Sequence, residues 1–576
     1  MGTLFYGDNL EIMRKYLKDE TVDLIYLDPP FNSKADYNLL FKEESGERSV
    51  SQIKAFTDFW HWDLSASTAY YELMRGNKTP SNVSTAIEAL VRLLGQNDMS
   101  AYLVMMAIRL LEMRRILKST GSIYLHCDPT ASHYLKIVID SIFGPENFKN
   151  EIIWRRHGSN NSANRFGPIH QTILFYGKSK ETIYYHPKGP YTNGYVHDFF
   201  TKEDQYGRFR LVPLTGAGVR SGESGKEWRG YNPTNGGRHW AIPEYLKRKY
   251  RDSTGKTLDE STTQEQLDLL DSIGMIYWGK DAKIPNYKFY LRDAEGAPLQ
   301  DIWAYQPGTE GCVFGNPDVA IDQDVMWLTG TNQEILGYPT QKPLGLLERI
   351  IRASSKEGDV VFDPFCGCGT TVHAAQKLGR DWIGIDITHL AINLVRNRLQ
   401  DAFRIKVEVE GEPRDLEGAK NLAIDDRFQF QWWALSLVGA RPFGGERKKG
   451  PDRGIDGVIY NPKGKNESYY GIVQVKSGHV KSGDIRDFRG TTEREKADYG
   501  IFISLENSTD EMRREAMSAG FLKTVWDENM QKIQILTIEE LMNGRKPDLP
   551  SKPEVFEKAR KEKTDKDRSG GNTTLD

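Results

Sequence analysis

The chain has 576 residues, which is too long for one compact core and predicts several domains. Hydrophobic residues make up 38% and charged residues 27%, so the chain is globular, and no apolar run reaches the roughly 20 residues of a membrane span. The net charge of −3 gives no global field for nucleic acid, and four cysteines exclude a disulfide scaffold and predict a cytoplasmic protein.

Strand-like and helix-like segments alternate along residues 1–150. The strand candidates are Leu4–Tyr6, Val22–Leu27 and Ser122–His126, and the helix candidates are Leu10–Leu17 and Ala101–Leu117. Such alternation predicts an α/β fold with a doubly wound parallel sheet. Residues from about 36 to 98 are polar and aromatic, and we interpret them as an insertion into this unit.

Residues 151–335 have a different texture, dense in Gly, Asn, Tyr, Trp and Arg and with weak periodicity. Between residues 151 and 260 there are 18 Lys or Arg against 11 Asp or Glu, a local balance of +7. The basic groups are interleaved with Trp154, Tyr195, Trp228, Tyr231 and Trp240, a mixture that suits phosphate contacts and base stacking. An irregular, solvated insertion explains the same composition, so both interpretations stay open.

The α/β pattern returns near residue 336. Leu344–Ala353 is a helix candidate, Val360–Asp363 and Trp382–Ile387 are strand candidates, and a helix between these strands runs to Leu378. The pattern predicts that residues 336–405 complete the same sheet.

The remaining third of the chain divides by composition. The charged segment 406–425 is expected to be a linker. The sequence pattern of residues 426–545 predicts a further α/β domain. The tail 546–576 is rich in Lys, Glu and Asp and is expected to be disordered.

A glycine-rich turn, Asp363-Pro-Phe-Cys-Gly-Cys-Gly-Thr-Thr371, follows a predicted strand and opens a helix, which is the context of a nucleotide-like ligand site. Gly367 and Gly369 permit a tight turn and let the backbone approach a ligand closely. Asp386 ends the next strand, 19 residues after Gly367, where a carboxylate can bind ribose hydroxyls.

A second motif, Asp28-Pro29-Pro30-Phe31, ends the strand candidate Val22–Leu27. A carboxylate at the carboxyl end of a buried strand projects into the cleft where such sheets bind ligands. Asp28 and the Pro29 carbonyl can accept the two hydrogens of an exocyclic amine, and Phe31 offers a flat face for stacking a base. Taken alone, the tetrad is more typical of a plain strand-to-loop turn with an exposed Asp.

Together, the two motifs resemble those of the DNA amino-methyltransferases of the permuted β class, in which the catalytic loop precedes the cofactor loop. The resemblance covers about residues 1–400. It implies a Rossmann-like enzyme that transfers a methyl group from S-adenosylmethionine to an amine of double-stranded DNA, within a restriction–modification system. It also implies a catalytic half at 1–150, a target-recognition region at 151–335 and a cofactor-binding half at 336–405.

The resemblance also implies the site residues. Gly7-Asp8 resembles the element whose Asp approaches the cofactor adenine, and Thr340-Gln341-Lys342-Pro343 resembles the element just before the cofactor strand. The implied catalytic residues are Asp28, Pro29, Pro30 and Phe31. The implied cofactor-binding residues are Asp8, Gln341, Lys342, Asp363, Phe365, Cys366, Gly367, Gly369, Thr370 and Asp386.

Asp at the first position of the catalytic motif is typical of adenine-N6 enzymes, whereas Ser is more usual for cytosine-N4, so the resemblance implies adenine, with cytosine-N4 as the alternative. The base must be flipped out of the duplex, with Phe31 as its stacking partner. The transfer needs no covalent enzyme intermediate, so Cys366 and Cys368 are not expected to be nucleophiles. Trp60, His61 and Trp62 lie in an insertion similar to that of type III modification subunits, and are expected to pack.

In the carboxyl-terminal domain, Asp456 precedes Gln474-Val475-Lys476 on neighbouring predicted strands. Asp456 could ligate Mg²⁺ with Gln474 and the Val475 carbonyl, and Lys476 could position an attacking water. This pattern resembles the Mrr-like branch of the PD-(D/E)xK nucleases and implies an endonuclease with Asp456, Gln474 and Lys476 as catalytic residues. The alternative is an inactive domain that only binds DNA.

Two further points concern the metal shell and the partners. Gln429 and Gln431 stand where many relatives of such nucleases place a Glu. The chain has no G-x-x-x-x-G-K-[ST] motif, so ATP-driven translocation would need a separate restriction or helicase subunit. A homodimer is left open.

Overall fold

The computed structural model describes residues 2–30, 36–39, 53–57, 62–76, 79–159, 164–259, 261–279, 285–329, 332, 334–336, 338, 340–443, 454–464, 467–524 and 529–550. The chain divides into two compact units. The first comprises Met1–Tyr185, Gln300–Tyr305 and Asp324–Asp576, and the second comprises His186–Leu299 and Gln306–Gln323. Within the described ranges, no helix has the length and apolar character needed to cross a membrane.

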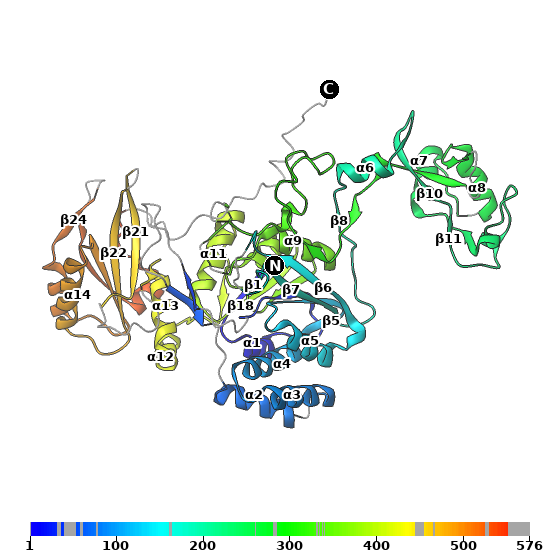
Figure 1. Ribbon diagram of the computed structural model, residues 1–576. Coiled ribbons are helices and arrows are strands. Elements are labelled where there is room, and N and C mark those ends of the chain that lie inside the picture. The colour runs from blue at the N-terminus through cyan, green and yellow to red at the C-terminus, as the bar shows by residue number, and fades with distance from the viewer. Residues whose placement is uncertain are drawn as a thin grey trace. The chain divides into compact units, whose positions relative to one another are not determined.

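The first unit contains a nine-stranded sheet in the order β16-β6-β7-β5-β2-β17-β18-β1-β19, of which Figure 1 labels β1, β5, β6, β7 and β18. Its strands are β1 (Gly2–Tyr6), β2 (Val22–Leu27), β5 (Leu117–Cys127), β6 (Phe148–Arg155), β7 (His170–Gly177), β16 (Ile302–Trp303), β17 (Val360–Asp363), β18 (Asp381–Asp386) and β19 (Val409–Glu410). Neighbouring strands are parallel except at β7, which runs antiparallel to β5 and β6. The predicted α/β fold with a doubly wound sheet is confirmed, and β7 is the antiparallel exception.

Helices cover both faces of this sheet. One face carries α1 (Asn9–Tyr16), α4 (Asp98–Ile116) and α5 (Ser132–Phe143), and the other carries α9 (Leu344–Ser354), α10 (Thr370–Lys377) and α11 (His389–Phe403). Strand β2 shows why: Ile25 and Leu27 pack into the first core, and Leu24 and Tyr26 into the second. A strand that is buried on both faces has a continuous apolar sequence, and this pattern predicted β2.

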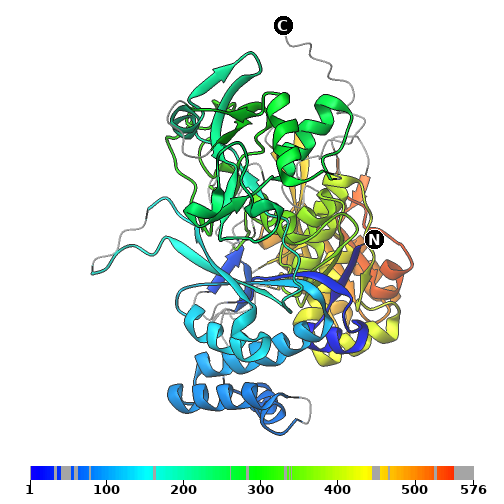
Figure 2. The same ribbon diagram turned by 90° about the vertical axis from the view of Figure 1, so that its right-hand side faces the viewer.

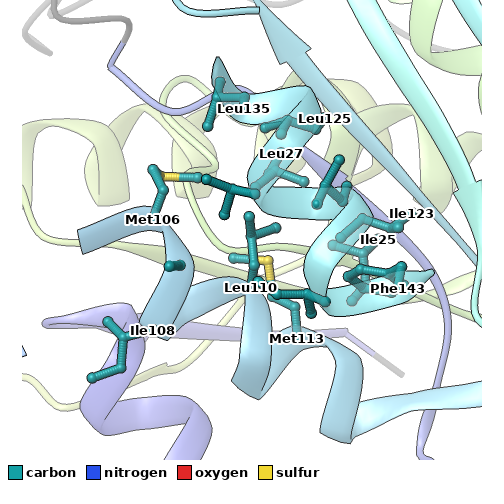
Figure 3. Close-up of a cluster of buried hydrophobic side chains, with 14 of the residues drawn as sticks. Ile25, Leu27, Met106, Ile108, Leu110, Met113, Ile123, Leu125, Leu135 and Phe143 are labelled. Atoms are coloured by element: carbon teal, nitrogen blue, oxygen red, sulfur yellow. The ribbon is translucent and has the colours of Figure 1, made fainter. Parts of the chain in front are cut away.

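The first of these cores lies between β2, β5, α4 and α5 (Figure 3). Its labelled side chains are Ile25, Leu27, Met106, Ile108, Leu110, Met113, Ile123, Leu125, Leu135 and Phe143. Two further helices, α2 (Leu64–Arg75) and α3 (Ser81–Leu94), cover α4 and α5 on the side away from the sheet (Figures 1 and 2). They belong to the segment that we interpreted as an insertion, which also contains a hairpin of β3 (Asp36–Leu39) and β4 (Ile53–Thr57).

The second unit has a core of its own. Its largest sheet has the order β13-β14-β10-β9. Its elements are β8 (Lys188–Gly189), α6 (Asn193–Phe199), β9 (Lys202–Asp204), β10 (Gly207–Pro213), β11 (Thr215–Ala217), β12 (Arg238–Trp240), α7 (Glu244–Thr254), α8 (Thr263–Ser272), β13 (Ile276–Tyr277), β14 (Asn286–Tyr290) and β15 (Ala297–Pro298). This unit is narrower than the expected region 151–335, because β6, β7 and β16 pair within the main sheet.

The carboxyl-terminal domain is built on a five-stranded sheet with the order β20-β21-β22-β23-β26. Its elements are α12 (Leu416–Asp425), α13 (Arg427–Leu437), β20 (Arg441–Pro442), β21 (Gly457–Gly464), β22 (Glu467–Lys476), α14 (Ser482–Arg494), β23 (Tyr499–Ser504), α15 (Asp510–Met517), β24 (Phe521–Lys523), β25 (Asn529–Gln531), β26 (Ile533–Thr537) and α16 (Ile538–Met542). The expected linker 406–425 was wrong in its second half. Residues 416–425 form α12, capped by Asp415, and its Ala419 is buried in the core of this domain.

Candidate functional site

Three carboxylates lie at the carboxyl ends of neighbouring parallel strands. Strand β17 pairs with β2 on one side and with β18 on the other. Asp28 therefore follows β2, Asp363 ends β17 and Asp386 ends β18, all at the same edge of the sheet. The chain after β17 leads to β18, whereas the chain after β2 leads to β5 on the other side, so the strand order reverses between β2 and β17. Open α/β sheets bind their ligands at such a point. Both predicted motifs meet there.

The glycine-rich turn after β17 is closed by its own backbone. Gly367 and Gly369 have φ angles of +48° and +75°, in the region where a side chain is strained. The Gly369 amide donates to the Cys366 carbonyl at 2.7 Å, and the Gly367 amide donates to Oδ2 of Asp386 at 2.9 Å. The turn leads into α10, whose first residue, Thr370, is buried.

Asp386 is bound from two sides. Besides the Gly367 amide, the amide and hydroxyl of Thr388 donate to its Oδ1, both at 2.9 Å. Burial raises the pKa of Asp386, and these hydrogen bonds oppose the rise. The next residue, Ile387, is apolar yet 54% exposed, so it offers an uncovered surface beside the carboxylate. Sequence reasoning took Ile387 only as the last residue of a strand.

Burial also acts on the carboxylate of Asp363. It raises the pKa of this group to about 7, against hydrogen bonds from Thr371 and from the Phe365 amide. Arg398, from α11, is buried and donates to the Cys368 carbonyl at 3.2 Å and to Oγ1 of Thr370 at 3.1 Å. These contacts hold the turn from its inner side.

The segment after β1 packs against the same turn. Asp8 caps α1, accepting a bond from the Leu10 amide at 2.8 Å, and it binds Nη2 of Arg109 at 2.7 Å. Nδ2 of Asn9 donates to the Pro364 carbonyl at 2.8 Å, and Nε of Arg109 donates to Oδ1 of Asn9 at 2.7 Å. Asp8, expected at the cofactor, is therefore brought to the site.

Asn9 and Arg109 were not predicted as site residues. Arg109 lies in a helix that is otherwise apolar over several turns, and it is 4% exposed. A charged residue in such a helix is rarely buried without a partner. This signal was present in the sequence, although it could not identify the partner.

Gln341 and Lys342 lie just before α9. Nε2 of Gln341 donates to the Glu334 carbonyl at 2.6 Å, and its Oε1 accepts from the Leu336 amide at 2.9 Å. Gln341 thus fixes a neighbouring loop. Lys342 is 8% exposed and its Nζ binds Oδ2 of Asp28.

The catalytic motif itself is described up to Pro30. Asp28 and Pro30 are half-buried and Pro29 is buried, whereas Phe31 lies outside the described residues. Behind the motif, the Tyr26 hydroxyl bonds to Nδ1 of His126 at 2.8 Å. His126 in turn bonds through Nε2 to Oε1 of Gln171 at 2.9 Å, and both residues are buried. This polar chain was not predicted.

The cysteines of the turn are buried. Burial raises the pKa of Cys366 well above its usual range and also raises that of Cys368. Because a thiolate is the reactive form, both are poor nucleophiles. Trp60 and His61 lie outside the described residues. Trp62 is partly buried against the first core, which agrees with packing.

The aromatic residues expected to stack bases divide in two groups. Trp154, Trp228 and Trp240 are each 3% exposed and belong to cores, so the expectation was wrong for them. Their indole nitrogens are satisfied internally, which explains burial. Tyr195 and Tyr231 are half-buried. The exposed aromatic residues of the second unit are others, namely Phe199, Tyr206, Trp278 and Phe314.

In the carboxyl-terminal domain, the candidate nuclease residues come together. Asp456 precedes β21, and its Oδ2 accepts from the Val475 amide on β22 at 2.6 Å. Gln474 and Lys476 are two residues apart on β22 and so share one face of the sheet. Among the described residues, no three His, Cys, Asp or Glu gather as a metal cluster. Gln429 accepts from the Tyr6 hydroxyl at 3.0 Å.

The chain is similar to known methyltransferases. It is 36% identical over 300 residues to the type II methyltransferase M.EcaI of Enterobacter cloacae, covering 52% of this chain and 57% of that protein. It is 26% identical over 388 residues to the Mod subunit of the type III restriction-modification enzyme StyLTI of Salmonella typhimurium, covering 65% and 50%. The chain thus spans about half the length of these relatives.

Among solved structures, TTHA0409 of Thermus thermophilus in complex with S-adenosyl-L-methionine is 15% identical, with a TM-score of 0.31, covering 72% of this chain and 100% of that one. Residues 436–543 match the family described as NACHT-associated inactive Restriction Endonuclease 1. Residues 22–397 match the DNA methylase family N6_N4_Mtase, which is more than half of the chain. The chain therefore belongs to this DNA methylase family.

Proposed function

We propose that the chain methylates adenine N6 in double-stranded DNA at a specific sequence, within a restriction–modification system. The observation that carries this proposal is the meeting of Asp28 with the turn 363–369 and Asp386 at one sheet edge. Membership of the DNA methylase family and the relatives named as methyltransferases support it. The Asp of the catalytic motif favours adenine over cytosine.

The residues at the sheet edge fit S-adenosylmethionine. A backbone turn with positive φ at Gly367 and Gly369 leaves room for close approach, Asp386 suits ribose hydroxyls, and the exposed Ile387 suits a flat ring. Asp8 would lie beside the adenine. When bound, S-adenosylmethionine supplies an activated methyl group and its leaving sulfur.

The catalytic motif then acts on the amine. Asp28 and the Pro29 carbonyl accept hydrogen bonds from the two N–H groups of the amine. These bonds direct the nitrogen lone pair away from both acceptors and toward the methyl donor. Phe31 stacks on the flipped base. Transfer is accelerated mainly because the reacting atoms are held in line, an orientation effect.

The test uses purified full-length chain, unmethylated plasmid DNA and S-adenosylmethionine, with modified nucleosides identified by mass spectrometry and positions by single-molecule sequencing. N6-methyladenine in one sequence motif is expected, and Asp28→Ala should abolish it. Detection of N4-methylcytosine would instead show that the enzyme is specific for cytosine N4. No methylation of plasmid or unmethylated genomic DNA by the wild type would contradict the proposal.

We further propose that the carboxyl-terminal domain is an Mrr-like endonuclease that requires Mg²⁺. The placement of Asp456 beside Gln474, Val475 and Lys476 favours this function. Mg²⁺ is commonly bound by one or two carboxylates and completed by water and phosphate. Asp456 would supply that carboxylate, with Gln474 and the Val475 carbonyl as further ligands and Lys476 beside the attacked phosphate.

The family that matches this domain carries the word inactive in its description, which favours the alternative of a DNA-binding module. Plasmids with and without methylation, incubated with Mg²⁺, separate the two. Mg²⁺-dependent cuts that Asp456→Ala removes, with methylation intact, are expected for an endonuclease. Binding without cleavage of either the methylated or the unmethylated plasmid would favour the DNA-binding module. A homodimer and a separate restriction or helicase subunit remain proposals for the partners.

A further inference from the structure

Lys342 makes a contact that its expected place in the cofactor pocket does not explain. Its Nζ forms an ion pair with Oδ2 of Asp28, across more than 300 residues of sequence. The pair is enclosed, because the side chains of Lys342 and Asp28 are 9% and 16% exposed. A second acceptor, the Thr340 carbonyl, lies 3.3 Å from the same ammonium. Lys342 thus contacts the carboxylate on which the proposed chemistry depends.

The surroundings of Asp28 are rich in groups that are neutral or negative. Among the described residues, those that interact electrostatically with Asp28 include Tyr26 on β2, Cys127 on β5, Asp363 on β17, and Tyr338 in the loop before Lys342. Asp386 adds a further carboxylate that acts on Asp363. Carboxylates held close together disfavour one another's ionised form. Lys342 places a positive charge in contact with Asp28 among these groups.

The Lys342 ammonium and the target amine would both donate hydrogen bonds to the carboxylate of Asp28. Each donates N–H groups to a carboxylate oxygen. Before DNA binds, Lys342 holds the oxygen that the amine is to reach. Because an ammonium has three donors, Lys342 can keep its bond to the Thr340 carbonyl while Asp28 turns toward the amine.

We propose that Lys342 is a positioning residue for methyl transfer, which holds Asp28 ionised and oriented until the target amine takes its place. This inference rests on the proposed methyltransferase function. Lys342 touches Asp28 and acts through it. Its loss should therefore change how the reaction depends on pH, and leave the fold in place.

The test compares Lys342→Met, which removes the charge at similar length, with Lys342→Arg, which retains it. Initial methyl incorporation into unmethylated plasmid DNA is measured between pH 5.5 and 9 at saturating S-adenosylmethionine. Lys342→Met should lower kcat about 10- to 100-fold at neutral pH, since misplacing a reacting group costs that much. In the profile of kcat against pH, the acid limb (the rise of kcat at low pH) should move up by about one pH unit in Lys342→Met. The reason is that less Asp28 is ionised at a given pH without the neighbouring cation. Lys342→Arg should recover the position of the acid limb.

The chain offers a matched control. Lys118 binds Asp23 at 2.8 Å, so the opposite end of β2 carries the same type of pair. Lys118→Met should keep the wild-type kcat and acid limb. If Lys342→Met kept both as well, or weakened cofactor binding in calorimetry without moving the acid limb, the proposal would be wrong.

A measurement without catalysis separates this proposal from the proposed function. Lys342→Met should lower the melting temperature at pH 8, because it leaves a half-buried carboxylate without this cation. Adding Asp28→Asn to that variant should restore part of the loss. A wild type that methylates no DNA but shows this coupling would contradict the function and leave the ion pair established. An uncoupled double variant in an active enzyme would overturn the role of Lys342 alone.

Discussion

Asp363 shows how a single buried carboxylate makes stability depend on pH. Its pKa rises from 3.8 to about 7 because the side chain is buried at the end of β17. Between these values the folded protein holds a proton that the unfolded chain has released. The contribution of this group is thus fully present below about pH 4 and is lost as the pH rises through about 7, at about 1.4 kcal/mol per pH unit.

Asp363→Asn removes this titration. We therefore expect the unfolding free energy of the variant to rise relative to that of the wild type as the pH rises. The difference in unfolding free energy should move by about 2–3 kcal/mol in favour of the variant between pH 5 and pH 8. Urea unfolding without cofactor at the two pH values measures it. A difference that stays constant with pH would contradict the assigned pKa.

Asn9 supports a second prediction for one residue. It joins the Pro364 carbonyl to Nε of Arg109, and Asn9→Ala leaves both groups buried without this partner. We expect the free energy of unfolding to fall by about 2 kcal/mol, together with a weaker affinity for S-adenosylmethionine. Calorimetry and urea unfolding measure the two effects. Asn82→Ala, which removes an exposed bond to the Ser141 carbonyl, is the control and should change little.

At the scale of elements, helix α13 makes much of the core of the carboxyl-terminal domain. Trp433 is 2% exposed within that core, whereas its neighbour Trp432 is only partly buried. Trp433→Ala should destabilise the domain by about 3–5 kcal/mol, because it leaves a large cavity. Limited proteolysis and urea unfolding should detect early unfolding of residues after 415. Trp432→Ala should cost clearly less, and equal losses would contradict this packing.

Elements with strong periodicity or continuous apolar runs could be predicted from the sequence, because both faces of the sheet are covered. Val22–Leu27 and Val360–Asp363 were predicted with the bounds that the structure has. Helix α12 could not be predicted, since its charged surface dominates the composition of 406–425 and the buried side of the helix is short. Strands β6 and β7 were assigned to another region, because the expected boundary at residue 151 followed the change in composition and not the apolar run of β7.

The same division holds for the site. Motif residues on strand ends, such as Asp28 and Asp386, could be placed because parallel strands bring their carboxyl ends together. Partners from distant segments could not be placed. Lys342 was expected at the cofactor, and only the folded chain shows its contact with Asp28.

At the scale of the whole molecule, the second unit is inserted through ends that lie side by side. Strand β8 pairs with β15, and the Leu299 amide donates to the Pro187 carbonyl at 3.1 Å. Replacing residues 190–296 by a short Gly-Ser linker should therefore leave the main sheet folded. If this unit reads the DNA sequence, the shortened chain should bind S-adenosylmethionine with near wild-type affinity in calorimetry but methylate no specific site. Methylation of the original sequence motif by the shortened chain would show that recognition does not need residues 190–296.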